Sequence, residues 1–370
     1  MDVTFTAPSS LSRTYFAEAP FEIICGDALT IISSLNGISV DTVITSPPYY
    51  QQREYGDDDA KEVGRERSID AYISSVVRVF SAIHLRPWGS IWVNIGDKRE
   101  HGNLLCVPER FIIAMQSAGF CLIDKVVWAK EAIEVDGSAS GQCMIEPAYG
   151  RLNGNGWEPF YRFVIDPEQA WSDTCAVRIP RRNLKSTRYR PESLMRCNTS
   201  LQGRNLGNVW RIPVPRNGAG HFAAMPPSLV ERPIAMTCPE FVTERGPRRR
   251  IIESVEYDEG RKSKCKLGQY TQAANEGGGT LSDEELRTKS GRQDAGREYV
   301  ARYPKTTGWT HDDLPSRPGI VLDPFSGTGT AGEAAIKLGR RFIGIELYPE
   351  FAARSVARCK QAAAALAELS

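Results

Sequence analysis

The sequence of 370 residues lacks a long hydrophobic run, paired cysteines and an excess of charge of either sign. A membrane-spanning helix needs roughly 18 consecutive apolar residues, so we expect no membrane segment. The nine cysteines include no C-x-x-C pair, which disfavours structural zinc and is typical of reduced thiols in a cytoplasmic protein. The start, M-D-V-T-F-T-A-P-S-S, has no basic and apolar regions of a signal peptide. With 46 basic and 45 acidic residues, total charge does not indicate an acidic partner.

Strand-like and helix-like segments alternate over the first 130 residues and again over the last fifty. This alternation predicts an α/β sheet with mostly parallel strands. We expect strands over 21–25, 41–45, 89–97, 121–130, 319–325 and 340–347. We expect helices over 28–35, 68–83, 107–120, 226–237 and 349–366, with a further helix after the glycine-rich loop at 326–332.

Two long regions break this pattern. Residues 131–225 show little periodicity, and within them 171–220 holds ten Lys or Arg against two acidic residues. Residues 241–300 contain 12 basic and 11 acidic residues. Such a high density of mixed charge predicts a solvated insertion or arm with some helix at L-S-D-E-E-L-R, rather than core.

The stretch T-S-P-P-Y-Y (45–50) directly follows the apolar run of one expected strand. Two consecutive prolines remove two backbone donors and fix two φ angles. A rigid turn of this kind holds carbonyl groups in set directions, with little entropy left to lose when a ligand binds. Taken alone, the stretch is also compatible with a turn whose tyrosines pack in the core.

Gly327, Gly329 and Gly332 form a G-x-G-x-x-G pattern between an expected strand and an expected helix. This pattern is typical of a dinucleotide site in which Glu346, about twenty residues on, holds ribose hydroxyls. A nicotinamide-binding chain usually opens with this unit. Here only 24 residues follow Glu346, so the rest of the sheet must come from the N-terminal third.

D-P-F-S-G-T-G-T (323–330) and T-S-P-P-Y (45–49) together resemble the motifs of the amino-directed DNA methyltransferases that use S-adenosylmethionine. The motif order resembles the β group of that family. The resemblance implies a Rossmann-like methyltransferase fold of the α/β class, with a mostly parallel twisted sheet, helices on both faces, and a circularly permuted chain with a target-recognition insertion. We therefore expect a catalytic and cofactor domain over 18–165, 221–240 and 318–370, a basic target-recognition region over 166–220, and a charged arm over 241–317.

The same resemblance assigns cofactor contacts. Asp323, Phe325 and the loop from Ser326 to Thr330 would hold the methionine end and the adenosine of S-adenosylmethionine. Glu346 would bind the ribose hydroxyls. The loop residues concerned are Ser326, Gly327, Thr328, Gly329 and Thr330. Segment 221–236 resembles the part of the family that packs behind the methionine moiety, although an ordinary amphipathic helix has the same pattern.

Asp27, in C-G-D-A-L, resembles the acid that lies near the adenine of the cofactor in this family. An acidic residue directly before a short helix is also a typical N-cap. Both roles remain open at this point.

The catalytic loop is expected to activate an exocyclic amine. The lone pair of that amine is delocalised into the base, which makes the nitrogen a poor nucleophile. Ser46 Oγ and the Pro47 carbonyl can accept its two N–H hydrogens, while Pro48 stiffens the turn and Tyr49 stacks on a base turned out of the duplex. No covalent intermediate and no strong base are needed.

Ser46, the residue directly before the two prolines, bears on the choice of base. In the family that the motifs resemble, Ser is usual at this position in enzymes that make N4-methylcytosine, and Asp or Asn in those that make N6-methyladenine. A serine hydroxyl can also donate, which suits cytosine, because its ring N3 is an acceptor beside the amine. We therefore expect N4 of cytosine, with N6 of adenine as the alternative.

Double-stranded DNA is the expected partner. Phosphate neutralisation needs basic side chains, and base reading needs donors. The candidates for either role, or for a solvated charge, are Arg181, Arg182, Lys185, Arg188 and Arg190. A separate cognate restriction enzyme is a further possible partner, and we expect no metal, since Cys238 and Cys265 are the only cysteines near the charged arm.

Other functions fit the sequence less well. Methylation of cytosine at position 5 needs a Pro-Cys nucleophile, whereas Cys238-Pro239 has the reverse order. Methyltransferases for RNA or protein amides usually place the cofactor motif before the P-P-Y loop. A nicotinamide oxidoreductase would leave T-S-P-P-Y and the basic region without a role. A catalytically inactive DNA-binding relative is disfavoured because both motifs are intact.

Overall fold

The computed structural model describes residues 19–35, 37–52, 63–130, 132–133, 139–140, 156–177, 205–214, 225–257 and 301–368. The chain divides into two compact units. The first comprises Met1–Val177, Gly207–Arg248 and His311–Ser370, and the second comprises Arg178–Leu206 and Arg249–Thr310.

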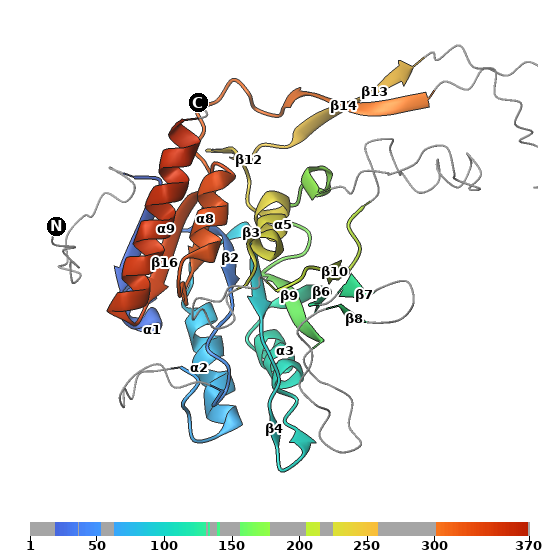
Figure 1. Cartoon of the computed structure of the whole chain (residues 1–370). Coiled ribbons are helices and arrows are strands. Elements are labelled where there is room, and N and C mark those ends of the chain that lie inside the picture. Colours follow the sequence, from blue (N-terminus) through green and yellow to red (C-terminus); the bar gives the residue numbers. More distant parts are fainter. Residues whose placement is uncertain are drawn as a thin grey trace, which may run out of the picture. The chain divides into compact units, whose positions relative to one another are not determined.

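An eight-stranded sheet forms the centre of the first unit (Figure 1). Its spatial order is β1-β16-β15-β2-β3-β9-β6-β10, and β9 alone among these eight runs antiparallel to its neighbours. The predicted α/β class with a mostly parallel sheet is confirmed. The strands are β1 (Phe21–Cys25), β2 (Val40–Thr45), β3 (Leu85–Asn94), β6 (Cys121–Ala129), β9 (Trp157–Val164), β10 (Val209–Arg211), β15 (Ile320–Asp323) and β16 (Arg341–Glu346).

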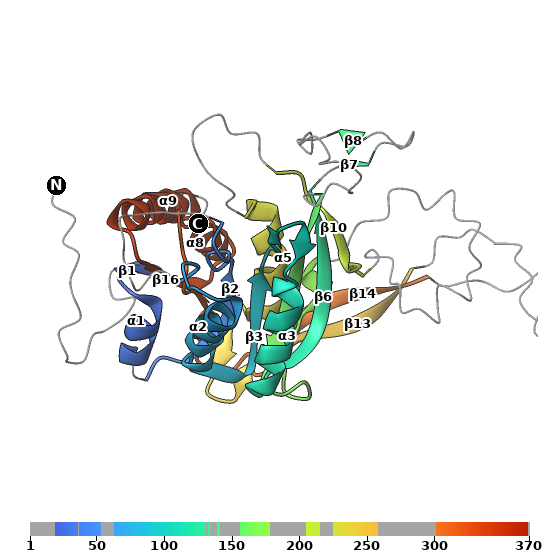
Figure 2. The same cartoon turned by 90° about the horizontal axis from the view of Figure 1, so that it is seen from below.

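Helices cover both faces of this sheet (Figure 2). One face carries α1 (Ala28–Ser34), α2 (Ile69–Ser81) and α3 (Val107–Ser117). The other face carries α5 (Pro227–Thr237), α8 (Thr330–Lys337) and α9 (Pro349–Ala367). A 3₁₀ turn, η1 (Thr174–Val177), packs against α5. Since parallel strands are hydrophobic on both sides, this double cover is what the near-continuous apolar strands require.

The sequence of α2 shows why a helix forms there. Ser68 is the N-cap, and its hydroxyl accepts from the backbone amide of Ala71 at 3.2 Å. Asp70 lies in the first turn and Arg78 in the last, which suits the helix dipole. Apolar residues recur every three or four positions and are buried on one stripe, namely Tyr72, Ile73, Val76, Val79 and Phe80.

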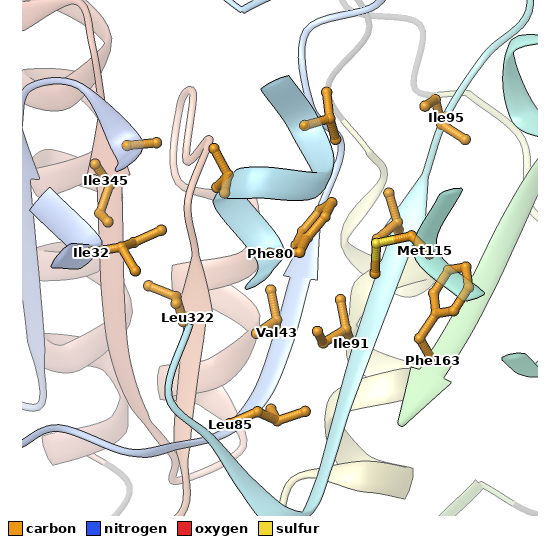
Figure 3. Close-up of a cluster of buried hydrophobic side chains, with 14 of the residues drawn as sticks. Ile32, Val43, Phe80, Leu85, Ile91, Ile95, Met115, Phe163, Leu322 and Ile345 are labelled. Carbon is orange, nitrogen blue, oxygen red and sulfur yellow. The ribbon is translucent and has the colours of Figure 1, made fainter. Parts of the chain in front are cut away.

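The main hydrophobic core lies between the sheet and α1, α2 and α3 (Figure 3). Val43 and Ile91 project from the central strands towards Phe80 of α2, and Met115 of α3 lies beside them. Buried side chains of this size each stabilise the fold by roughly 1.5–3 kcal/mol. This core fixes the central strands, whose carboxyl ends carry the two sequence motifs.

Two strands of the sheet were not predicted. The region 131–225 was expected to be irregular, yet β9 and β10 lie within it. Strand β9 reads W-E-P-F-Y-R-F-V, a run without alternation that contains a proline, so neither of the usual strand signals is present. It is buried on both faces between β3 and β6. Strand β3 also begins earlier than predicted, at Leu85.

The described part of the second unit is dominated by a hairpin of β13 (Arg250–Tyr257) and β14 (Ala301–Trp309). These strands were not predicted, and the helix expected at L-S-D-E-E-L-R lies outside the described residues. Arg250 faces Trp309 across the base of the hairpin, 4.5 Å from the ring centroid. The expected domain boundaries at 165, 220, 240 and 317 stay a prediction.

Short strand pairs complete the described structure: β4 (Arg99–Glu100) with β5 (Asn103–Leu104), β7 (Ala132–Ile133) with β8 (Ala139–Ser140), and β11 (Val242–Thr243) with β12 (Gly246–Pro247). Within the described residues, no helix combines the length and apolar character needed to cross a membrane.

Candidate active site

The two sequence motifs leave neighbouring strands of the sheet. β15 pairs in parallel with β2, with Val321 opposite Thr42 and Leu322 opposite Val43. Parallel strands end at the same edge, so the Ser46 loop after β2 and the Asp323 loop after β15 start side by side. β1 and β16 end at this edge too, which adds Asp27 and Glu346. Ligands of open α/β sheets bind outside the carboxyl ends of the strands.

The glycine loop after β15 has the backbone shape that its sequence predicts. Gly327 has φ of 51° and Gly329 has φ of 82°, a left-handed conformation that other residues rarely adopt. A Cβ on Gly329 would lie 2.5 Å from the Ser355 hydroxyl of α9, whereas a Cβ on Gly327 would meet nothing within 4 Å. Gly329 thus permits close packing of the loop on α9, while Gly327 leaves backbone open for a ligand.

Glu346 is the last residue of β16 and is 8% exposed. Its Oε2 accepts from the Gly327 amide at 2.7 Å, and its Oε1 accepts from the Tyr348 amide at 3.0 Å. Burial raises the pKa of this carboxyl group, while the amide hydrogen bonds hold it back. The carboxylate is therefore fixed in orientation beside the glycine loop, and its contact with ribose hydroxyls stays a prediction.

Asp323 ends β15 and is 3% exposed. Its Oδ1 accepts from the Phe325 amide at 3.0 Å. Burial raises the pKa of Asp323 to about 7, the Thr45 hydroxyl and the Phe325 amide oppose this, and the charge of Glu346 adds to it. Two carboxylates beside an open stretch of glycine backbone fit a ligand with positive charge and hydroxyl groups, and S-adenosylmethionine is such a ligand.

Arg358, on α9, holds the glycine loop in place and was missed by the sequence reasoning. Its Nη1 donates to the Thr330 hydroxyl at 2.8 Å and to the hydroxyl and carbonyl of Thr328 at 3.3 and 3.4 Å. Its Nε lies 3.0 Å from Glu333 Oε2. No motif marks this arginine, because the contact depends on how α9 packs against α8.

Asp27 lies two residues past the end of β1 and is the N-cap of α1. Its Oδ1 accepts from the backbone amide of Thr30 at 2.8 Å and from the Thr30 hydroxyl. The N-cap role, one of the two that the sequence left open, is therefore present. Contact with a cofactor adenine stays a prediction.

The Pro-Pro turn is held from below by α2. The Tyr72 hydroxyl donates to the Pro48 carbonyl at 3.0 Å, and its ring lies 5.5 Å from that of Tyr50. Tyr50 is buried in the core. This internal bond uses the carbonyl of Pro48, the neighbour of the predicted acceptor Pro47.

The tip of Tyr49 is anchored in a polar cluster. Its hydroxyl lies 3.0 Å from Asn94 Oδ1, at the end of β3, and 2.9 Å from Glu158 Oε2, at the start of β9. Ser46 Oγ donates to the same hydroxyl at 3.4 Å. Burial and the Glu158 carboxylate raise the pKa of Tyr49, so its proton is retained. Base stacking by Tyr49 stays a prediction; its hydrogen-bonding role was missed.

Glu158 lies at the sheet edge that carries the two motif loops, because β9 is antiparallel to its neighbours β3 and β6. In the antiparallel pair, Trp128 of β6 faces Glu158, and Asn94 of β3 faces Phe160. The first residues of β9 therefore lie where parallel strands end. Lys130, just past β6, forms an ion pair with Glu158 Oε1. Lys130 lay at the end of the predicted strand 121–130, but the position of Glu158 could not be predicted without β9.

The structure thus brings together the T-S-P-P-Y loop (45–49), the glycine loop, Asp27 and Glu346 at one edge of the sheet. Segment 221–236 is described from residue 225, and its helix α5 packs against α8 and β2. The basic candidates Arg181, Arg182, Lys185, Arg188 and Arg190 lie outside the described residues.

Comparison with known proteins agrees with this arrangement. The family model described as DNA methylase, for N6- and N4-directed methyltransferases, matches residues 40–243 and 313–357. The Type II methyltransferase M.Cfr9I of Citrobacter freundii is 23% identical over 382 residues, covering 94% of this chain and 91% of that protein. M.SfiI of Streptomyces fimbriatus is 26% identical over 218 residues, covering 54% of this chain but only 48% of that protein.

A solved structure shows the same fold. The PvuII DNA methyltransferase (cytosine-N4-specific) superposes with a TM-score of 0.50 at 18% identity, over 91% of this chain and 86% of that one. Because the family model covers more than half of the sequence, and both of its motifs meet at one sheet edge, the chain belongs to the DNA methylase family of N6- and N4-directed methyltransferases.

Proposed function

We propose that the protein transfers a methyl group from S-adenosylmethionine to the exocyclic amine of a base turned out of double-stranded DNA, and that this amine is N4 of cytosine. The observation that supports this most strongly is the pairing of β2 with β15. It sets the amine-binding loop and the cofactor loop next to each other at one edge.

When bound, S-adenosylmethionine supplies an electrophilic methyl group on a positively charged sulfur. Asp323 and Glu346 provide the matching negative charge and ribose acceptors, and the open backbone at Gly327 allows close approach. We assign Phe325, Ser326, Thr328, Gly329 and Thr330 to the same binding loop, and Asp27 to the adenine end.

At the catalytic loop, Ser46 Oγ and the Pro47 carbonyl accept the two amine hydrogens. This draws the nitrogen towards a tetrahedral shape and frees its lone pair for in-line attack on the methyl carbon. The surplus proton leaves the nitrogen afterwards, to water. Because the turn is rigid and Tyr72 fixes the Pro48 carbonyl, little reorganisation is needed when the base arrives.

The choice of cytosine rests on Ser46. A neutral hydroxyl is a weaker acceptor than the carboxylate or amide found at this position in adenine-directed members of the family. In this structure the Ser46 hydroxyl donates to Tyr49, so its single proton is not available to the cytosine ring N3. The proposal of cytosine therefore rests on the residue type at position 46. N6 of adenine is the competing target.

Target recognition is assigned to the basic region 166–220, where positive side chains can neutralise phosphates and donate to base edges. We assign the enzyme to the cytoplasm, in association with its proposed DNA substrate. Because the relatives are Type II methyltransferases, a separate restriction enzyme for the same site is the proposed partner. A neighbouring endonuclease gene would support this pairing.

The decisive experiment incubates the protein with radiolabelled S-adenosylmethionine and, in parallel, unmethylated DNA, RNA or protein. Label is expected in DNA alone. Digestion of that DNA and mass spectrometry of the nucleosides should then show N4-methylcytosine. N6-methyladenine without N4-methylcytosine would overturn the choice of base, and label confined to RNA or protein would overturn the substrate class.

A further inference from the structure

The polar cluster around Tyr49 determines whether the Ser46 hydroxyl donates or accepts a hydrogen bond. A serine hydroxyl can donate or accept a hydrogen bond. If Ser46 is to accept an amine hydrogen, its own proton must point elsewhere. The neighbours of Ser46 decide whether this condition holds before any substrate arrives.

Two acceptors face the Tyr49 hydroxyl. Asn94 Nδ2 donates to the Pro159 carbonyl at 3.0 Å, which turns Asn94 Oδ1 towards Tyr49. Glu158 Oε2 lies 2.9 Å from the same hydroxyl, and a carboxylate only accepts. The single Tyr49 proton must go to one of them. A lone pair of Tyr49 therefore remains for Ser46, whose Oγ lies 3.4 Å away.

The ion pair with Lys130 holds this arrangement. Lys130 Nζ binds Glu158 Oε1, which leaves Oε2 directed at Tyr49. Both residues are largely buried, and the ammonium also lies 5.2 Å from the Trp128 ring centroid. Hydrogen bonds to a charged acceptor are roughly twice as strong as neutral ones, so the Tyr49 proton goes to Glu158.

We propose that Glu158 is a positioning residue that acts through Tyr49: Glu158 accepts the hydrogen bond of the Tyr49 hydroxyl, Tyr49 accepts the hydrogen bond of the Ser46 hydroxyl, and the Ser46 lone pairs are thereby kept free for the amine of the target base. The inference rests on the proposed amino-methyl transfer. It adds a chain of hydrogen bonds from Glu158 of β9 through Tyr49 to Ser46, and no proton is transferred along this chain.

The test compares single-turnover methylation by wild type, Glu158→Gln, Tyr49→Phe and the double variant, with saturating DNA and S-adenosylmethionine. The glutamine amide can donate to Tyr49 and so removes the fixed direction. We expect Glu158→Gln to lower the rate about 10- to 100-fold, with both dissociation constants within about twofold of wild type. Because Glu158 acts through Tyr49, the double variant should be no slower than Tyr49→Phe.

Asp70→Asn is the matched control. It removes a carboxylate whose partner, Arg110, lies on the exposed surface of the first unit, and its rate should equal that of wild type. Losses that multiply in the double variant would overturn the proposal, since Glu158 would then act independently of Tyr49. An unchanged rate in Glu158→Gln would overturn it as well.

A second measurement does not depend on activity. Glu158, which forms an ion pair with Lys130, is the carboxylate that faces the Tyr49 hydroxyl, and the charge of Tyr72 adds a smaller increase to the pKa of Tyr49. Removing the Glu158 charge should let Tyr49 ionise at lower pH, seen as tyrosinate absorbance after subtracting the matching Tyr49→Phe spectra. If wild type methylates no DNA, the proposed function fails. If Tyr49 titrates alike with and without Glu158, the positioning chain fails instead.

Discussion

The ring of Tyr49 lies directly on the backbone of Gly96. A Cβ at Gly96 would be 2.5 Å from Tyr49 Cε2 and 2.8 Å from Cδ2, closer than real Cβ atoms approach. The glycine that follows β3 therefore shapes the catalytic loop that follows β2. Any larger residue would push the ring, and with it the hydroxyl cluster, out of place.

Gly96→Ala should lower the methylation rate about a hundredfold, because displacements of about 1 Å at a reacting centre have effects of that size. Single-turnover kinetics measures this loss, and calorimetry should show unchanged affinity for S-adenosylmethionine. The control is Gly308→Ala, where a Cβ meets its nearest neighbour, Ile251 Cδ1, at 3.9 Å. Equal rates for the two variants would contradict the role given to Gly96.

Cofactor affinity should depend on pH through Asp323. Burial raises the pKa of Asp323 to about 7, and a cationic cofactor favours the ionised carboxylate. Affinity for S-adenosylmethionine should therefore rise with pH between about 6 and 8, up to tenfold per pH unit below that pKa. Asp323→Asn should bind more weakly and show a flat profile. A slope of equal size in that variant would assign the dependence to another group.

The stability of the cofactor-free protein should change in the opposite direction. In the unfolded chain Asp323 titrates near its ordinary value of 3.8, whereas in the folded protein its pKa is about 7. Between these values the folded state holds the extra proton, so this group's contribution to stability is lost as pH rises. Asp323→Asn should thus raise the melting temperature more at pH 8 than at pH 5. A uniform shift would show that the buried carboxyl group is not the cause.

Arg358→Ala should weaken cofactor binding about tenfold by releasing Thr328 and Thr330 from α9. Hydrogen bonds from charged donors contribute about 1.5–3 kcal/mol each, of which part is recovered by water at this half-exposed position. Titration calorimetry with S-adenosylmethionine measures the loss. Arg354→Ala, on an exposed turn of the same helix, is the control. Equal affinities would mean that the loop holds its shape without Arg358.

Charge removal at Arg181 and Arg182 should weaken DNA binding and leave cofactor affinity unchanged. If each arginine neutralises one phosphate, the plot of log affinity against log salt should lose about 0.9 in slope per residue. Fluorescence anisotropy with a labelled duplex at several salt concentrations measures both quantities. Unchanged DNA affinity would place the recognition surface elsewhere.

Much of the fold was predictable because most strands follow simple rules. β1, β2 and β16 are short apolar runs that end at Gly, Pro or an acid, and the pattern located them within a residue or two. α2 and α9 show clear helical spacing. β9 was missed because it is buried on both faces and contains Pro159, so it neither alternates nor looks like a typical central strand.

The loops of the candidate site were predicted from the sequence, whereas the side chains that hold them in place were not. Ser46, Asp323 and Glu346 lie within recognisable short motifs. Glu158 contacts Tyr49, which lies 109 positions away in the sequence. Lys130 contacts Glu158 across 28 positions. Such contacts depend on strand order and direction, which local pattern does not encode. The cap role of Asp27 was readable because it is local.

The direction of β9 also has a consequence for the segment of chain that joins β6 to β9. β6 finishes and β9 starts at the active edge, and the chain is pinned there by the bond from the Lys130 amide to the Gly156 carbonyl at 2.9 Å. A change in the length of the segment between these two residues would therefore leave the pairings of the eight-stranded sheet unaltered.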